Sequence, residues 1–318
     1  MDRFNLKSFV FINYSLCFLV LNIITIFVAR AQQDPQYSQY MFNMLTINPA
    51  TAGEDRFIDA YMLNRIQWSG FEGAPRSTDA GISSQLSLLG EKDGVALNFS
   101  SDKIGYYQNV TVKMNYSYGL AVGGGDLRLG VSLGVLNKQF KPKWKDPNFG
   151  DDPAIPTADI ASVAFDLGGG VYYKHKYYYI AASITHINQA KFETEGNDLF
   201  VNRNYYLTAG GEIKSPWQKI VFHPSMLLKY DGVVSQLEAS LLATYKRRYW
   251  GGLTYRLNDA VVVLGGIELR NGLRIGYSYD VSTSSLSSYS SGSHEVYLAY
   301  RISLASKRSH NYKSVRFL

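Results

Sequence analysis

Five histidines and one acidic cluster are the side chains of this sequence with the most scope for chemistry. The histidines are His175, His186, His223, His294 and His310. None of them has a second histidine and a carboxylate at metal-ligand spacing. Ser293, His294 and Glu295 have the residue types of a hydrolase triad, but neighbours on a strand point to opposite faces. We therefore expect no catalytic residue, no metal and no cofactor, and no enzyme.

The acidic cluster lies in a long loop and comprises Asp146, Asn148, Asp151 and Asp152. Clustered oxygens can bind calcium, but this loop lacks the central glycine and the closing glutamate of an EF-hand. A solvated loop is the favoured interpretation, and calcium in the Asp146–Asp152 loop stays the open alternative. The glycine triplets at 123–125 and 168–170 lack the lysine and helix of a phosphate loop, so we interpret them as turn or strand-bend glycines.

In the segments that must position these residues, apolar residues alternate with polar or small ones, which is a period of two. In residues 127–135, leucines and valines alternate with Arg128 and small residues, and 108–119, 272–282 and 293–304 behave alike. Such alternation indicates extended strands with one apolar and one polar face. A soluble sandwich would alternate too, so this pattern alone does not decide between a sandwich and a membrane barrel.

Three further features favour the membrane barrel. The interleaved residues are often small or charged, as on the wall of a hydrated lumen. Many segments have about ten residues, which lets a tilted strand cross a membrane. The 25 tyrosines gather near segment ends, where an apolar ring with a polar tip suits a membrane–water interface. The sequence therefore predicts an all-β fold, a transmembrane antiparallel up-and-down β-barrel of about fourteen strands.

The connections support this count. The predicted strands are 57–66, 78–88, 93–102, 108–119, 126–140, 160–174, 177–187, 204–214, 219–230, 233–245, 249–257, 260–270, 272–282 and 293–304. Numbered in chain order, every even-numbered predicted strand is followed by a short connection. The long connections all follow odd-numbered strands and lie at 67–77, 139–159, 188–203 and 283–292. Outer-membrane barrels have short periplasmic turns and long outward loops, so we expect residues 57–304 to form such a barrel, with both termini in the periplasm.

Residues 1–31 have the pattern of a cleaved signal peptide. Arg3 and Lys7 precede an apolar run at 9–28, and Ala29 and Ala31 give the small residues of a cleavage site. A membrane anchor is the alternative, since a run of about 20 apolar residues can span a bilayer. The only cysteine lies in this leader, so the mature chain would have no thiol.

The net charge of +6 comes from the leader and from a basic tail at 305–318. The rest of the chain is near neutral, so we expect no nucleic-acid partner. The tail could bind an acidic periplasmic partner, or it could be a solvated end. Inside the barrel, the alternation places charged side chains on the lumen face, namely Lys113, Arg128, Arg256, Arg274 and Asp280.

The segment at 32–56, between the leader and the first strand, is polar, aromatic and rich in amides. We predict that it folds into or against the periplasmic mouth as a plug or partner-binding segment; a disordered leader is the alternative. Its candidate residues are Asp34, Pro35, Tyr37, Tyr40, Asn43, Asn48 and Pro49. The next candidates, Trp68, Phe71 and Pro75, lie in a glycine-rich loop that could contact a partner or fold over the barrel mouth.

Several short motifs occur in a fixed order along the chain. They are the segment 32–43, Asn48-Pro49-Ala50, Gly53, the run 65–75, Asp102-Lys103-Ile104-Gly105, the run 273–280, and Tyr289 with the run 292–295. Read together, they resemble the PorP/SprF family of type IX secretion system membrane proteins, over nearly the whole mature chain. Each motif alone is weak, and the ordered set carries the resemblance.

The resemblance implies a component of the outer membrane of a Bacteroidetes bacterium. It would help a client protein with a C-terminal sorting domain, such as a gliding adhesin, to be secreted or attached at the cell surface. Its implied partners are that client, periplasmic or outer-membrane secretion subunits, and the lipid bilayer. The alternative function is a passive porin-like or FadL-like barrel for small solutes or lipids, for which the inward basic residues would suit an anionic solute.

Overall fold

In the computed structural model, β-strands make up most of the described chain. The structure describes residues 34–55, 57–90, 92–142, 159–192, 199–216, 219–288 and 290–303. The predicted leader, the Asp146–Asp152 loop, Tyr289 and the basic tail lie outside these residues.

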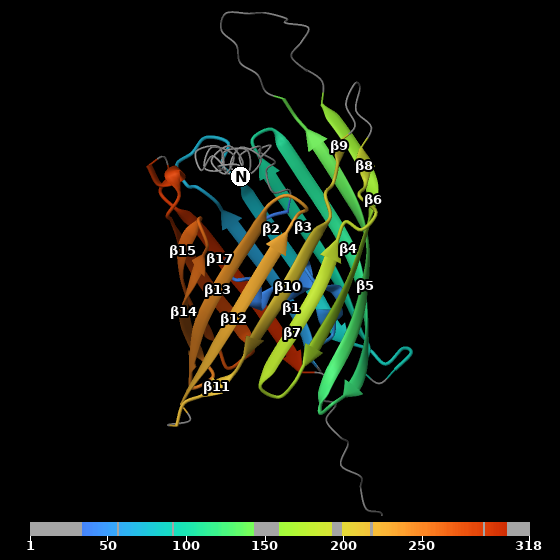
Figure 1. The fold of residues 1–318 in the computed structure, drawn as a ribbon, viewed down its shortest axis with the longest axis vertical. Coiled ribbons are helices and arrows are strands. Elements are labelled where there is room, and N and C mark those ends of the chain that lie inside the picture. The colour runs from blue at the N-terminus through green and yellow to red at the C-terminus, as the bar shows by residue number, and fades with distance from the viewer. Residues whose placement is uncertain are drawn as a thin grey trace, which may run out of the picture. The chain divides into compact units, whose positions relative to one another are not determined.

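The strands close into one antiparallel barrel (Figure 1). Their bounds are β1 (Phe57–Ile66), β2 (Arg76–Gln85), β3 (Gly94–Ile104), β4 (Tyr107–Val122), β5 (Gly125–Phe140), β6 (Ile160–Lys174), β7 (Tyr178–Thr185), β10 (Asn204–Gly211), β11 (Ile213–Lys214), β12 (Ile220–Tyr230), β13 (Ser235–Tyr245), β14 (Tyr249–Arg256), β15 (Ala260–Glu268), β16 (Leu273–Ser282) and β17 (Ser293–Ser303). Both β10 and β11 pair with β12 and are separated only by Glu212, so the wall has 14 strands. The predicted fold class and strand number are confirmed.

Closure comes from pairing the first strand with the last. β1 pairs with β17 from Phe57 opposite Ser303 to Ile66 opposite His294, and also with β2. Every strand of the wall therefore has a neighbour on each side. This matters in lipid, where an unpaired backbone polar group costs several kcal/mol. Two short strands, β8 (Lys191–Phe192) and β9 (Leu199–Phe200), pair with each other outside this sheet.

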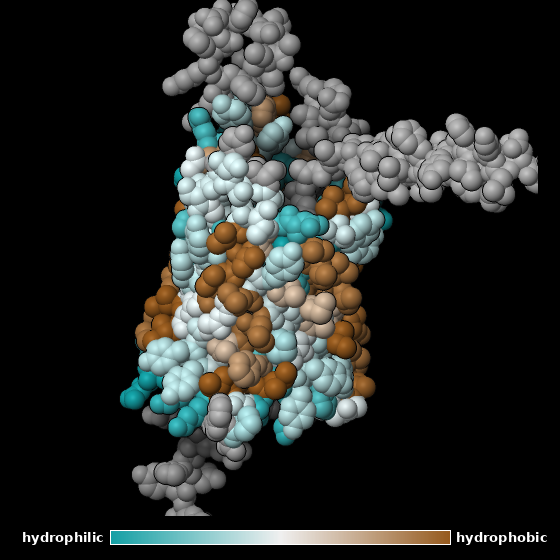
Figure 2. All heavy atoms as spheres, turned by 60° about the vertical axis from the view of Figure 1, so that its left-hand side comes forward, coloured by the Kyte–Doolittle hydropathy of each residue, from teal (hydrophilic) through white to brown (hydrophobic). Residues whose placement is uncertain are grey.

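Because successive residues of a strand point to opposite faces, side chains alternate between the lipid-facing and the lumen-facing side of the wall. On β5, Leu129, Val131, Leu133 and Val135 are exposed on the outer face, whereas Arg128 is buried on the inner face. Figure 2 shows hydrophobic residues gathered around the middle of the barrel and hydrophilic residues towards its lower rim. This arrangement matches a bilayer-facing belt between two wetter ends.

The two ends of the barrel differ in their connections. One end, the turn end, has turns such as 123–124, 175–177, 246–248 and 269–272; the other, the long-loop end, has connections such as 67–75 and 283–292. The turn between β2 and β3 is longer than predicted, because β2 stops at Gln85. There the Asp93 carboxylate accepts hydrogen bonds from the backbone N–H groups of Leu89 and Gly90, at 2.6 and 2.7 Å, and ends the strand early.

The helical content described is limited to short 3₁₀ turns. They are η1 (Tyr40–Phe42), η2 (Met44–Thr46), η3 (Pro49–Thr51) and η4 (Ser285–Ser288). Among the described residues, no helix has the length and apolar character needed to cross a membrane.

Candidate functional site

Residues 34–55, here called the inner segment, run inside the barrel from the long-loop half to the turn end (Figure 1). At one end, Asp34 contacts His186, which follows β7, and Tyr206, near the start of β10. At the other, Glu54 forms an ion pair with Lys174, the last residue of β6. The sequence predicts a plug that folds into or against the periplasmic mouth, and residues 34–55 lie inside the barrel, between wall residues near both of its ends.

The inner segment has no regular element longer than one 3₁₀ turn. Asn48 caps η3, since its side-chain oxygen accepts the Ala50 N–H at 2.9 Å, and Pro49 occupies the first helical position. These are the preferred residue types for such positions. The Asn48 amide also donates to the Val171 carbonyl of β6 at 3.1 Å, so the capping residue ties the segment to the wall.

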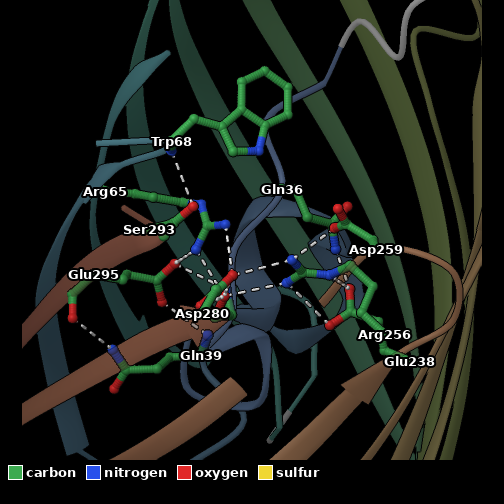
Figure 3. A network of polar contacts seen from close by, with 12 residues as sticks. Gln36, Gln39, Arg65, Trp68, Glu238, Arg256, Asp259, Asp280, Ser293 and Glu295 are labelled. Atoms are coloured by element: carbon green, nitrogen blue, oxygen red, sulfur yellow. Dashed lines mark hydrogen bonds and ion pairs between the residues drawn. The ribbon is translucent and has the colours of Figure 1, made fainter. Parts of the chain in front are cut away.

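A buried polar cluster holds the segment at Ser38 and Gln39 (Figure 3). This Ser38 cluster consists of Ser38, Arg65, Arg256, Asp280 and Glu295. The Ser38 hydroxyl donates to Asp280 at 2.7 Å and accepts from Arg65 at 2.7 Å and Arg256 at 3.2 Å. The Ser38 backbone N–H donates to Glu295 at 2.8 Å, and the next backbone N–H, of Gln39, does the same.

The Ser38 cluster is incomplete without the inner segment. Arg65 pairs with Asp280 at 2.7 Å and with Glu295 at 3.3 Å, while Arg256 pairs with Asp280 at 3.1 Å and with Glu238 at 3.4 Å. All five of these wall side chains are at most 1% exposed. Three carboxylates face two guanidinium groups there, so backbone N–H groups of the segment supply the missing donors. A buried carboxylate without such partners is strongly unfavourable.

A second cluster holds the amino end of the segment. This Asp34 cluster consists of Asp34, Asp166, His186, Tyr206 and Lys229. His186 Nε2 lies 2.9 Å from Asp34 and its Nδ1 lies 2.7 Å from Asp166. The Tyr206 hydroxyl donates to Asp34 at 2.8 Å, and the Lys229 ammonium donates to the Asp34 carbonyl at 2.8 Å.

The charges of the Asp34 cluster shift two pKa values outside the strands. Burial alone would raise the pKa of Asp34, but the charge and hydrogen bond of His186 and the nearby lysines hold it well below its usual range. Burial alone would lower the pKa of His186, but Asp34 and Asp166 raise it above its ordinary value. Each charge therefore favours the ionised form of the other, in a charge-assisted contact between segment and wall.

At the turn end, Arg128 binds backbone carbonyls of the segment. Its guanidinium donates to the carbonyl of Ala50 at 3.1 Å, to that of Ala52 at 2.6 Å and to the Ser117 hydroxyl at 2.5 Å. Past these contacts, Asp55 pairs with Arg301 at 3.1 Å. The segment thus leaves the lumen held by charges and enters β1.

Glycines of the wall allow this close approach. A Cβ atom on Gly130 would lie 2.1 Å from the backbone nitrogen of Ala50, and one on Gly170 would lie 2.1 Å from the Asn48 side-chain oxygen. Real Cβ atoms do not come this close. The role of Gly170, a residue of the second glycine triplet, is therefore to make room for the segment.

Aromatic side chains fill the space beside the polar clusters. The Phe42 ring lies 5.4 Å from both the Trp250 and the Tyr297 ring. Tyr37 packs with Leu63 and Tyr297, and the Tyr40 hydroxyl lies 2.9 Å from Ser225. Asn43 is also buried, so all seven candidate residues of the segment lie within the barrel.

The candidates of the glycine-rich loop lie apart from the inner segment. Ser69 exchanges two backbone hydrogen bonds with the connection before β17, and the Trp68 N–H donates to the Ser293 hydroxyl at 3.1 Å. Phe71 is half exposed at the long-loop end, whereas Pro75 is buried. The loop is therefore fixed against its neighbour, with Phe71 presented outward.

The five predicted lumen charges all have partners inside the barrel. Lys113 pairs with Asp166 at 3.3 Å and Arg274 with Asp59 at 3.1 Å. Arg128, Arg256 and Asp280 have the contacts given above. None of the four basic residues is free for an anionic solute.

Sequence reasoning missed most of the other buried ionisable residues in and around the two clusters. They are Arg65, Asp166, His186, Lys229, Glu238 and Glu295. The alternation of the strands contained the information needed to find two of them. Arg65 on β1 is two residues from the inward Leu63, and Glu295 on β17 is two residues from the inward Tyr297, so both face the lumen. Cross-strand pairing places Arg65 directly opposite Glu295.

Cavities flank the inner segment. One of about 60 Å³ lies beside the Asp34 cluster and is lined by polar residues of β3, β4 and β5. Two larger ones lie at the turn end, of about 240 Å³ next to β1 and β17 and about 330 Å³ next to β6, β7, β12 and β13. The segment therefore divides the space inside the barrel. Among the described residues, no cluster of three metal-ligating side chains is found.

A family model for the type IX secretion system membrane protein PorP/SprF matches residues 29–300. The chain belongs to the PorP/SprF family. This match covers the strands and the inner segment together, so the resemblance inferred from the ordered motifs is confirmed. The family and the fold are those of an outer-membrane secretion barrel, not those of an enzyme.

Comparison with solved structures finds barrels similar to this PorP/SprF protein at very low sequence identity. The Ralstonia pickettii toluene transporter TbuX gives a TM-score of 0.50 at 9% identity, over 81% of this chain and 92% of the transporter. A Pseudomonas aeruginosa FadL homologue gives a TM-score of 0.46 at 9% identity, over 86% of this chain and 95% of the homologue. No curated protein matches the sequence.

Proposed function

We propose that this PorP/SprF protein is a client-linked component of type IX secretion whose barrel is closed by its own inner segment. The carrying observation is the Ser38 cluster, in which backbone N–H groups of the segment complete a buried charge network of the wall. A segment held in this way is part of the folded barrel. The protein would then serve secretion through its two ends, not through a solute path.

The orientation follows from the loops. Short turns of outer-membrane barrels face the periplasm and long loops face the exterior. In this arrangement Glu54 and the turn end face the periplasmic secretion subunits. The loop with Phe71 and the connection before β17 face the cell surface, where a client with a C-terminal sorting domain would be attached, as for gliding adhesins of Bacteroidetes.

The alternative function is a passive transporter for small solutes or lipids. Its support is the shared fold with the toluene transporter TbuX. Against it, the basic side chains predicted to attract an anionic solute are all paired. The inner segment, moreover, occupies the lumen that a solute would need.

An affinity purification from the native host tests the secretion role. A tag in the loop at Asp151, which follows β5, leaves the Ser38 cluster and the turn end unaltered. We expect recovery of a large surface protein through its C-terminal sorting domain, together with periplasmic secretion subunits. A second strain lacking this gene should lose that client from the cell surface.

The matched control is the same tag on an unrelated barrel of the same membrane. Recovery of the barrel alone, with the client still on the surface of the deletion strain, would contradict the proposal. Solute conductance by the purified intact protein would then favour the transporter.

A further inference from the structure

The larger turn-end cavity has the features of a binding site for a side chain. It measures about 330 Å³ and opens between the inner segment and the wall. Its lining includes Met41, Phe42, Met44, Tyr179, His223 and Leu242. Ligand sites are commonly pockets of this size, lined by apolar and aromatic groups with a few polar ones. Methionine and aromatic linings adapt to large apolar side chains.

Most charged side chains of the turns next to this cavity are basic. The turns that join β6 to β7, β11 to β12 and β13 to β14 carry, with the adjoining strand ends, Lys176, Lys214, Lys219, Lys246, Arg247 and Arg248. Of these six, Lys176 lines the cavity itself, as do Glu212 and the ion pair of Glu54 with Lys174. Among the described residues, none of these six has a carboxylate within ion-pair distance; Lys176, Lys246 and Arg248 instead lie over tyrosine rings. Their charges are therefore available to an acidic partner.

The turn after β13 holds two of these residues in an unfavourable backbone conformation. Lys246 has a φ of 51° and Arg247 a φ of 55°. This left-handed region costs an ordinary L-residue about 1–2 kcal/mol, and tight hairpins usually place asparagine or glycine there. Basic residues at strained positions indicate that their side chains serve a purpose other than folding.

We infer that this mouth binds an acidic peptide segment of a periplasmic partner and takes one large apolar or aromatic side chain of that segment into the cavity. The inference rests on the proposed orientation, in which the turn end faces the periplasm. Charges spread over three turns suit an extended chain. A small aromatic molecule would fill the cavity without using them, and an anionic lipid headgroup would use the charges without the cavity.

A fluorescence anisotropy titration of the purified full-length protein in a neutral detergent tests the inference. The probe is a labelled pentapeptide with a central tryptophan flanked by two acidic residues on each side. Two comparison peptides replace the tryptophan by alanine or the acidic residues by lysine. We expect saturable binding of the first peptide and binding of the other two at least about fivefold weaker, as expected for a side chain that must be buried and charges that must be matched.

Two variants separate the cavity from the basic turns. Thr244→Trp fills the cavity from β13, and the double change Lys246→Asn with Arg247→Gly removes two charges while relieving the strained turn. Each should weaken the acidic tryptophan peptide about fivefold or more. The double variant should be at least as stable to heat as the parent, which separates lost binding from lost folding. The matched control is Arg270→Asn, an exposed basic residue in the turn before β16, which lies outside the three turns and should bind as the parent does.

Equal binding of the tryptophan and alanine peptides would overturn the inference and identify charge-only, headgroup-type binding. Unchanged binding by Thr244→Trp or by the double variant would also overturn it. The titration uses no secretion assay. If the peptides do not bind but the affinity purification recovers a client, the peptide site at the cavity is rejected and the proposed role in secretion is kept.

Discussion

The guanidinium of Arg65 on β1 lies 2.7 Å from the carboxylate of Asp280 on β16, and both side chains are 1% exposed. The Ser38 hydroxyl of the inner segment contacts both groups. Removing one partner of a buried ion pair leaves an uncompensated charge. The network therefore holds the segment against β1 and β16 of the wall.

Replacing Arg65 by methionine should destabilise the barrel by about 3–5 kcal/mol, because buried Glu295 loses its guanidinium partner and buried Asp280 keeps only Arg256. Thermal unfolding in detergent, followed by electrophoretic mobility, measures this loss. Arg274→Met is the matched control, since its partner Asp59 lies at the more solvated turn end. It should lose less stability than the Arg65 variant, and equal losses would contradict the assignment.

Ser38→Ala should loosen the inner segment while the wall stays folded. The change removes a hydroxyl that bonds to Asp280, Arg65 and Arg256, a loss of about 1–3 kcal/mol. Hydrogen exchange of the amides of residues 34–55 should become faster, with exchange in β5 unchanged. The exposed turn residue Ser87 provides the control, because Ser87→Ala should leave the segment protected. Unaltered protection in the Ser38 variant would argue against the cluster as the anchor.

Gly130→Ala should displace the segment, because its Cβ atom would meet the Ala50 backbone at 2.1 Å. Overpacking of this kind costs about 1–3 kcal/mol. Gly169→Ala is the control, since a Cβ atom there finds its nearest neighbour at 3.6 Å. Thermal stability should fall for the first variant and stay within about 0.5 kcal/mol of the parent for the second. A tolerated Gly130→Ala would show that the segment does not pack against β5 as described.

The amino end of the segment should detach as the pH rises. His186 has a raised pKa, so its stabilisation is complete below the ordinary value of 6.5 and is lost as the pH passes the higher folded value. Asp34 has a lowered pKa, so its stabilisation persists above the ordinary value of 3.8 and is lost only in stronger acid. Asp166, Lys113, Lys229 and Tyr206 face this pair from the wall.

Hydrogen exchange of residues 34–37, corrected for intrinsic rates, should therefore quicken as the pH rises above the ordinary histidine pKa of 6.5 and through the higher folded value. His186→Gln should remove this dependence, because glutamine does not titrate. Protection that instead weakens as the pH falls from about 7 to about 5 would contradict the ion pair.

The strands could be predicted from the sequence because each must show lipid on one face and the lumen on the other, which imposes a period of two. Short connections follow the even-numbered predicted strands and long ones follow odd-numbered strands, and this alternation predicted the up-and-down order. The path of the inner segment could not be predicted, because it has no regular period. Its contacts join residues more than 200 positions apart, such as Ser38 and Glu295. Such pairs come together only after the barrel closes.

Single-channel conductance in planar bilayers tests most directly the claim that the inner segment closes the barrel. The intact protein should show little or no steady conductance. Deleting residues 33–52 should open a stable, ion-conducting pore, because the wall keeps its strands while the lumen empties. Ser38→Ala should give intermittent openings between these extremes. An intact protein that conducts as a wide pore, or a deletion that leaves the trace unchanged, would contradict this account.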